Sequence, residues 1–231
     1  MNLNDPNVAL VEVVVQALGK LRDRFVFVGG CAAGLLVTDM ARPPVRATVD
    51  VDLIVEVVNR NNYYQLAKEL RAIGFREDDG SAVICRWRVG EVKVDIMPTD
   101  EEILHFRNRW YKRAVERANR YVLPSGQEIN LISPPLFVAT KLDAFNDRGN
   151  GDYALSHDLE DIVTLVDGRP ELVEEIKAAD DDVRAFIMEE IDDLLATPAF
   201  VDALPGHFPG DEANQARVPS LIARLRAIAG I

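Results

Sequence analysis

Residues 25–57, FVFVGGCAAGLLVTDMARPPVRATVDVDLIVEV, decide how this chain folds. Their pattern predicts a buried strand, a tight glycine turn, a short helix, a loop marked by prolines, and a second strand. The first strand, FVFV, is apolar throughout, as expected for a strand that is covered on both faces. Gly29 and Gly30 break this strand and open the helix. Glycines at a helix N-terminus let backbone N–H groups approach a phosphate closely, so the turn suggests a phosphate site.

The second strand carries two acids one residue apart, Asp50 and Asp52. Strand side chains alternate between faces, so these two share one face at a separation of about 7 Å. The alternating apolar residues are expected on the other face: Val49, Val51, Leu53 and Val55. Two like charges this close repel each other unless a cation lies between them, and a divalent metal ion is the simplest explanation. An exposed strand face without a metal is the plain alternative.

Composition places the chain among ordinary globular proteins. Its 231 residues and 48% hydrophobic content allow one large domain, or a domain with a helical extension. No apolar run approaches the roughly 18 residues of a membrane span, and no basic region precedes the N-terminal apolar stretch. Cys31 and Cys85 form neither a metal-like spacing nor a disulfide framework. We therefore expect a reduced, cytoplasmic location and no membrane partner.

The charge of the chain is polarised. The net charge of −12 argues against a nucleic-acid partner, but residues 158–193 alone hold 14 acids against three bases. The remainder is close to neutral and contains a basic stretch between Arg107 and Arg120. Such a stretch is most often a solvated face, and binding of RNA or of a triphosphate is the alternative.

A third strand acid, Asp95, lies where the hydrophobic pattern changes to a period of two. From Ala82 to Met97 the apolar residues alternate with polar ones around a Gly90-Glu91 turn, which predicts a β-hairpin. Asp95 falls on the polar side of the second strand of this hairpin. It is therefore either a third metal-site carboxylate or a solvated strand residue.

The rest of the chain is mainly helical. Residues 105–120 predict a helix, or a helix that leads into a strand, and residues 121–132 predict a second hairpin. Helices are expected at 61–71, 136–146, 156–168, from there to about 197, and 221–228, with a loop rich in prolines as the linker before the last one. Residues 1–132 are accordingly expected to form a first part that contains the strands, and residues 133–231 a helical C-terminal part.

These motifs, in this order, resemble a known family. Gly29-Gly30 followed by Arg46-x-Thr48-x-Asp50-x-Asp52-Leu53 resembles the signature of the DNA polymerase β-like nucleotidyltransferase superfamily, and more closely that of the AbiEii/AbiGii toxin-type nucleotidyltransferases. The second half of that signature, a helix lysine and then a D-x-x-D-like helix, is matched by ATKLDAF at 139–145 and HDLEDI at 157–162. The resemblance spans Phe25 to Gly168. The superfamily often has serine after its glycine, where this chain has Gly30 and Cys31, so only backbone contact with a phosphate is expected there.

The resemblance implies an α+β fold, with a mixed sheet flanked by helices and a helical C-terminal part. It further implies that residues 1–132 form the catalytic core and that residues 133–231 complete the active site. It also implies a role for each matching residue. The implied metal ligands, for Mg²⁺ with Mn²⁺ as an alternative ion, are Asp50, Asp52 and Asp95. The implied catalytic residues are these three together with Lys141 and Asp158, with Asp95 as a candidate base. The implied nucleotide-binding residues are Gly29, Gly30, Thr48, Lys141 and Arg148.

The expected activity is transfer of a nucleoside monophosphate from an NTP to an acceptor hydroxyl, on a tRNA 3′ end, a protein or a small molecule. The toxin resemblance favours tRNA, and a cognate antitoxin would then be an expected partner. The alternative from another class is a non-catalytic module of the same fold that binds a nucleotide or a partner protein. A metal-dependent phosphohydrolase ranks lowest, because the chain has only three histidines. Lys141, Asp158 and Asp161 each have the plain alternative of a solvated surface position, and the role of Asp161 is left open.

Overall fold

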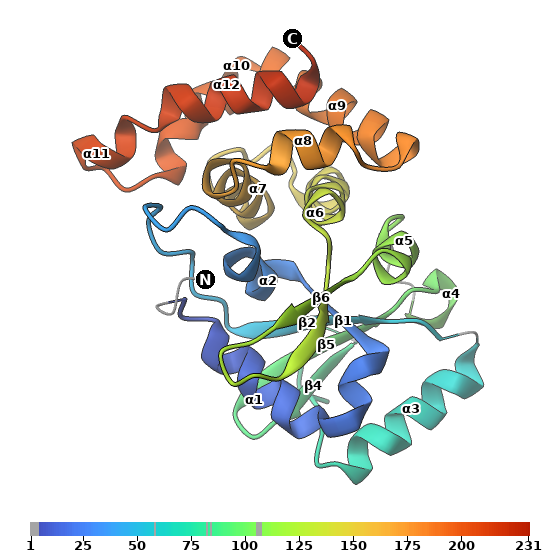
Figure 1. The fold of residues 1–231 in the computed structure, drawn as a ribbon. Coiled ribbons are helices and arrows are strands. Elements are labelled where there is room, and N and C mark those ends of the chain that lie inside the picture. The colour runs from blue at the N-terminus through green and yellow to red at the C-terminus, as the bar shows by residue number, and fades with distance from the viewer. Residues whose placement is uncertain (1–4, 58, 82, 84, 105–107) are drawn as a thin grey trace. The chain divides into compact units, whose positions relative to one another are not determined.

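The computed structural model describes residues 5–57, 59–81, 83, 85–104 and 108–231 (Figure 1). The chain forms two compact units. The sheet unit comprises the described residues up to Leu35 together with Arg46–Ser133, and the helical unit comprises Leu36–Val45 together with Pro134–Ile231.

The sheet unit is built on a mixed sheet, which has seven strands within the described residues, in the order β3-β4-β5-β2-β1-β7-β6. The strands are β1 (Phe25–Val28), β2 (Asp50–Val55), β3 (Arg76–Glu77), β4 (Arg86–Val89), β5 (Val92–Pro98), β6 (Asn119–Val122) and β7 (Glu128–Leu131). β2 runs parallel to β5 and β1 runs parallel to β7, while the other neighbours are antiparallel. The expected mixed sheet flanked by helices is therefore confirmed.

Helices cover the central strands. The helical segments of the sheet unit are α1 (Val8–Leu18), η1 (Gly19–Arg24), α2 (Gly29–Leu36), α3 (Arg60–Ala72), α4 (Glu101–Leu104) and α5 (Tyr111–Glu116), with the last residue of α2 counted in the helical unit. α1 contacts β2 and β5 through an apolar stripe that is fully buried. All four residues of β1 are buried, as the unbroken apolar run predicts. Val49, which was expected to belong to β2, lies one residue before that strand begins and is 72% exposed.

Two expected elements of the sheet unit are confirmed. β4 and β5 form the predicted hairpin, in which Arg86 lies directly opposite Asp95. The hairpin strand begins at Arg86 rather than at Ala82, and residues 82 and 84 lie outside the described part of the chain. β6 and β7 form the second hairpin, and α5 leads into β6, although residues 105–107 of the expected helix also lie outside the described part.

The helical unit contains α6 (Pro134–Arg148), α7 (His157–Gly168), α8 (Leu172–Lys177), α9 (Asp181–Ala196), α10 (Pro198–Ala203), η2 (Leu204–His207), α11 (Glu212–Gln215) and α12 (Val218–Ala229). α6 contacts α7, α8 and α9, and α12 packs on α7 and α9 (Figure 1). The expected proline-rich linker is wrong, since α10, η2 and α11 fill most of it. The reason is that Pro198, Pro205 and Pro219 occupy the first turns of α10, η2 and α12, where a helix tolerates proline.

The segment Leu36–Val45 packs with the helical unit although it separates α2 from β2 in sequence. The N–H groups of Thr38 and Asp39 both donate to the carbonyl of Gly168 at the end of α7, each at 2.9 Å. Among the described residues, no helix combines the length and the apolar character needed to cross a bilayer.

Candidate active site

Three strand acids, Asp50, Asp52 and Asp95, lie on one face of the sheet, which we call the acid face. Asp50 and Asp52 lie two residues apart on β2, and Asp52 pairs in parallel register with Asp95 on β5. Residues in register on neighbouring strands point to the same side of a sheet, so all three side chains share one face. Asp95 is buried, and Asp50 and Asp52 are partly exposed. The arrangement of the three acids follows from strand geometry alone.

Gly29 leaves room for one of these acids. Its φ is +65°, and a Cβ placed on it would lie 1.9 Å from Oδ2 of Asp52. Only glycine therefore allows the Asp52 carboxylate to lie against the turn that opens α2. Gly30 is buried as the second residue of α2. The neighbouring Cys31 is fully buried, and its thiol donates to the carbonyl of Val28 at 3.1 Å, so this side chain is engaged with the backbone.

A short network orients the start of β2. The hydroxyl of Thr48 donates to Oδ1 of Asp50 at 2.9 Å. The side-chain amide of Asn7, which is fully buried, donates to the carbonyl of Arg46 and accepts from the N–H of Thr48 at 2.8 Å. Thr48 thus supports the acid strand, while Arg46 contributes through its backbone. Asn7 carries this support from the start of α1.

Arg86 joins two of the three acids. Its guanidinium donates twice to Asp95, from Nε to Oδ1 and from a terminal nitrogen to Oδ2, at 2.7 Å each. The same terminal nitrogen donates to Oδ2 of Asp50 at 2.8 Å. These carboxylates raise the pKa of Arg86 above its ordinary value, mainly through the hydrogen bonds with Asp95. The cation that the closely spaced strand acids demand is thus present in the chain itself.

The donor set suits a divalent cation in its chemistry, because Mg²⁺ and Mn²⁺ prefer carboxylate oxygens and three of these groups share one face. Nucleotidyltransferases generally use divalent metals. However, in the described part of the chain no three His, Cys, Asp or Glu side chains are drawn together into a group that could hold an ion. Two of the three acids, Asp50 and Asp95, are instead bound by the guanidinium of Arg86.

The helical unit holds a second cluster of charges. Lys141 of α6 is only 8% exposed, and its Nζ lies 3.1 Å from Asp158 and 2.6 Å from Asp161, both on α7. Asp158 and Asp161 are themselves buried, so the plain alternative of a solvated surface is wrong for all three. Spacing of three residues places the two acids on one side of α7. Asp161, whose role was left open, is the closer partner of Lys141.

Arg148 completes this cluster at the end of α6. Its guanidinium donates to both oxygens of Asp158 at 2.9 Å each, while its side chain stays 60% exposed. Burial raises the pKa of Asp158, but the charges of Lys141 and Arg148 outweigh this effect and hold that pKa below its usual value. The carboxylate therefore stays ionised, and Arg148 keeps an exposed surface towards solvent.

The basic stretch is partly neutralised where the structure describes it. Arg120 lies 2.9 Å from Asp23, and Arg113 lies 3.9 Å from Glu116. Lys112 is exposed on α5. Arg107 lies outside the described residues.

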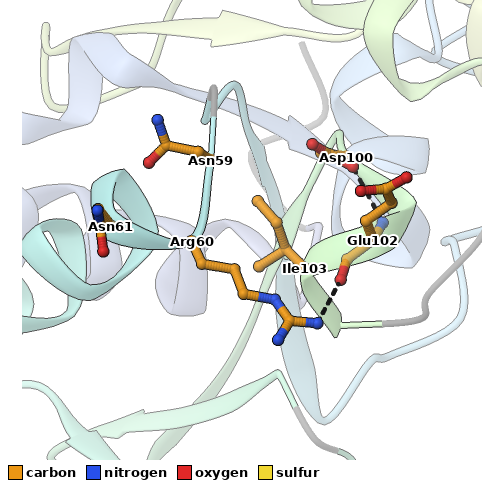
Figure 2. A pocket seen from close by; sticks show the side chains of 6 residues that line it. All are labelled: Asn59, Arg60, Asn61, Asp100, Glu102 and Ile103. Carbon is orange, nitrogen blue, oxygen red and sulfur yellow. Dashed lines mark hydrogen bonds between the residues drawn. The ribbon is translucent and has the colours of Figure 1, made fainter.

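A hollow of about 400 Å³ lies elsewhere in the sheet unit, beyond the ends of β2 and β5 (Figure 2). Asn59 accepts from the N–H of Asn62 and Asp100 accepts from the N–H of Glu102, so both cap helices. Arg60 donates to the carbonyl of Glu102 at 3.0 Å. These groups are engaged in local structure at the end of β2 opposite Asp50, and we assign them no part in the chemistry.

Sequence reasoning missed two residues of the acid face, Arg86 and Asn7. Arg86 could have been found, because a two-residue turn at Gly90-Glu91 pairs Val89 with Val92 and therefore sets Arg86 opposite Asp95. Asn7 gave no such signal, since its contacts reach 39 and 41 residues along the chain.

A mixed sheet with strand acids beside a glycine turn, followed by helices, defines the class of the nucleotidyltransferases. The chain belongs to the family described as nucleotidyl transferase AbiEii toxin, type IV toxin–antitoxin system, whose model matches residues 13–226. The resemblance found in the sequence is thereby confirmed, and the non-catalytic alternative is not supported.

Two solved structures show a loose likeness to the chain. An antigenic nucleotidyltransferase-like protein from Paracoccidioides brasiliensis is 21% identical, with 88% of this chain and 94% of that chain covered at a TM-score of 0.48. The antibiotic-resistance factor ANT(2'')-Ia is 15% identical, with 82% and 95% covered at a TM-score of 0.47. No curated protein sequence matches the chain significantly.

Proposed function

We propose that the protein is a Mg²⁺-dependent nucleotidyltransferase that transfers a nucleoside monophosphate from an NTP to an acceptor hydroxyl. The observation that carries this proposal is the acid face, where Asp52 lies against Gly29 and in register with Asp95. Chemistry on a triphosphate needs carboxylates of this kind, since transfer of phosphoryl groups depends mostly on positioning and on charge stabilisation.

In this proposal Asp50, Asp52 and Asp95 would hold the ion. When bound, a divalent ion would supply positive charge that neutralises the charge developing on the phosphates. Thr48 keeps the Asp50 carboxylate oriented by its hydrogen bond. The backbone N–H groups after Gly29 and Gly30 would donate to phosphate oxygens at the start of α2.

The proposed reaction forms a bond between the acceptor oxygen and the α-phosphorus and breaks the bond from that phosphorus to the bridging oxygen of the β-phosphate. Pyrophosphate leaves with the bonding electron pair, and Asp95 is the candidate that accepts the proton of the acceptor hydroxyl. Lys141 would contact the phosphates, and Asp158 would orient Lys141 through the ion pair at 3.1 Å. Arg148 would offer its exposed guanidinium to the nucleotide or to the acceptor.

The proposed acceptor is a tRNA 3′ end, with a protein hydroxyl as the other candidate. The family description makes a cognate antitoxin the expected partner in the cell.

The test is incubation of the full chain with each α-³²P-labelled NTP, Mg²⁺, total RNA and lysate protein, followed by separation of the labelled species. Asp52→Asn and Lys141→Met are expected to lower transfer by at least about 100-fold. Asp23→Asn and Lys177→Met, which change exposed ion pairs of the same two units, serve as matched controls. Transfer that persists in both site variants would overturn the proposed roles, and the labelled species identifies the acceptor.

A further inference from the structure

Arg86 contacts acids on two strands, whereas a simple cross-strand pair would join it to Asp95 alone. Arg86 lies on β4, and β5 lies between β4 and β2 in the sheet. Its side chain must therefore extend past β5 to contact Asp50 on β2. Its side chain is 15% exposed, and the side chains of Asp50 and Asp95 are 22% and 10% exposed. A charged group in such a partly buried place needs well-formed hydrogen bonds, and Arg86 makes three.

All four carboxylate oxygens of Asp50 and Asp95 are engaged by protein donors. Arg86 takes both oxygens of Asp95 and Oδ2 of Asp50, and the hydroxyl of Thr48 takes Oδ1 of Asp50. An ion that binds these carboxylates must share or replace those bonds. The guanidinium therefore stands as a direct competitor of a cation at this face.

Arg88 shows that this arrangement is particular to one position. It lies two residues along β4, on the same face as Arg86, and its Nε donates to Asp78 at 3.0 Å. Arg88 contacts no strand acid in the described part of the chain, and its side chain is 40% exposed. Arg86 and Arg88 are thus a matched pair on one strand. Only Arg86 contacts the acids of β2 and β5.

We propose that Arg86 is a positioning residue that acts as an internal counter-ion: it holds Asp50 and Asp95 together in the absence of metal and competes with the ion for both of them. The inference rests on the proposed function, since it takes the acid face as the metal site. Removal of Arg86 leaves three carboxylates with one positive charge fewer. The folded state then tolerates the absence of metal less well and binds a cation more tightly.

The test measures Mn²⁺ binding to the full, metal-free chain by the EPR signal of free Mn²⁺, together with thermal unfolding in EDTA and in Mn²⁺. Arg86→Gln is expected to bind Mn²⁺ about tenfold more tightly than the unmodified protein, because a full charge next to the site is lost. It is also expected to unfold at a lower temperature in EDTA and to regain more stability from Mn²⁺. Arg88→Gln, which removes the same charge two residues away, should change none of these quantities measurably.

The possible outcomes separate this inference from the proposed function. If Asp52→Asn abolishes Mn²⁺ binding and Arg86→Gln tightens it, both stand. If Asp52→Asn abolishes binding but Arg86→Gln binds with equal or lower affinity, the counter-ion role of Arg86 is wrong while the metal site stands. If neither the unmodified protein nor Arg86→Gln binds Mn²⁺, the metal site itself is wrong and the inference falls with it.

If Arg86→Gln does not fold in EDTA, a second variant, Arg86→Lys, tests the inference instead. Arg86→Lys keeps the charge, but an ammonium cannot span both carboxylates as the planar guanidinium does. It is expected to bind Mn²⁺ about threefold more tightly than the unmodified protein. An unchanged affinity in Arg86→Lys would overturn the inference in that case.

Discussion

Gly29 combines a positive φ with a close approach to the Asp52 carboxylate. Gly29→Ala is expected to lower the free energy of unfolding by about 3 kcal/mol, because a Cβ both disfavours the positive φ and overlaps the Asp52 carboxylate. Displacement of Asp52 should also lower nucleotidyl transfer by at least about 100-fold. Urea unfolding and the transfer assay check the two effects separately.

Gly126 offers the matched control for this change. It also has a positive φ, of +83°, but a Cβ there would meet nothing within 4 Å. Gly126→Ala should therefore cost only the backbone strain, about 1 kcal/mol, and leave transfer unchanged. Equal effects of the two variants would show that the approach of Asp52 to Gly29 is unimportant.

Asp158 should make stability depend on pH in a defined direction. Its folded pKa lies below the ordinary value of about 3.9, so its contribution is fully present above that value and is lost as the pH falls through the folded pKa. Asp158→Asn should cost about 3 kcal/mol at pH 6, since it breaks a buried pair, and clearly less at pH 3.5. Urea unfolding at the two pH values measures the difference, with Asp181→Asn, a 93% exposed position, as the control. A cost that is the same at both pH values would contradict the role given to the Asp158 carboxylate.

At the scale of residues, the sequence predicted which acids lie together more readily than which residue they contact. The i, i+2 spacing of Asp50 and Asp52 requires a shared face, and the hairpin period places Asp95 on a polar side. The cation beside them was expected to be a metal, and the structure shows Arg86 there. Charge repulsion demands a cation but does not specify which one, because that depends on register between strands. The catalytic and metal-binding roles of these residues stay predictions.

At the scale of elements, α7 carries buried polar side chains along its whole length. Asp158, Asp161, Thr164 and Asp167 follow one another at intervals of three, and all are buried. The first two pair with Lys141, and the last pairs with Arg217 at 2.9 Å and with Arg42 at 3.6 Å. Buried side chains of one helix therefore organise cations from α6, from the segment Leu36–Val45 and from the start of α12.

The burial of these side chains predicts a large cost for a change at the end of α7 opposite to Asp158. Asp167→Asn should lower the free energy of unfolding by about 3 kcal/mol, because it leaves Arg42, whose side chain is 8% exposed, without its carboxylate partner. Asp193→Asn, on the exposed side of α9, should stay within about 0.5 kcal/mol. Urea unfolding compares the two, and a cost below about 1 kcal/mol for Asp167→Asn would show that the buried ion pairs contribute little.

Local patterns predicted most elements, and long-range contacts account for the failures. The hairpins, the helix of Lys141 and the Ser156 cap of α7 follow from period and capping within a few residues. The docking of Leu36–Val45 onto the helical unit depends on Arg42 and Gly168, which are more than 120 residues apart, so no local signal exists for it. That the helical part completes the active site stays a prediction.

At the scale of the whole molecule, charge is the property that bears on the acceptor. Residues 158–193 carry a net charge of −11 from 14 acids and three bases, so nearly all of the net −12 lies in the helical unit. A nucleic-acid acceptor would need cations for its phosphates, and the described part of the basic stretch, 108–120 in the sheet unit, is where the sequence gathers them.

This polarity predicts how the reaction responds to salt. With tRNA as the acceptor, its KM should rise steeply between about 50 and 200 mM salt, because phosphate contacts release counter-ions, while the KM for NTP changes little. Lys112→Gln, which alters an exposed cation of α5, should raise the KM for tRNA a few-fold and leave the KM for NTP unchanged. Lys177→Gln in the acidic region should change neither. Steady-state kinetics at two salt concentrations decide the matter: a KM for tRNA that is insensitive to both salt and Lys112→Gln would exclude the basic stretch as the tRNA surface.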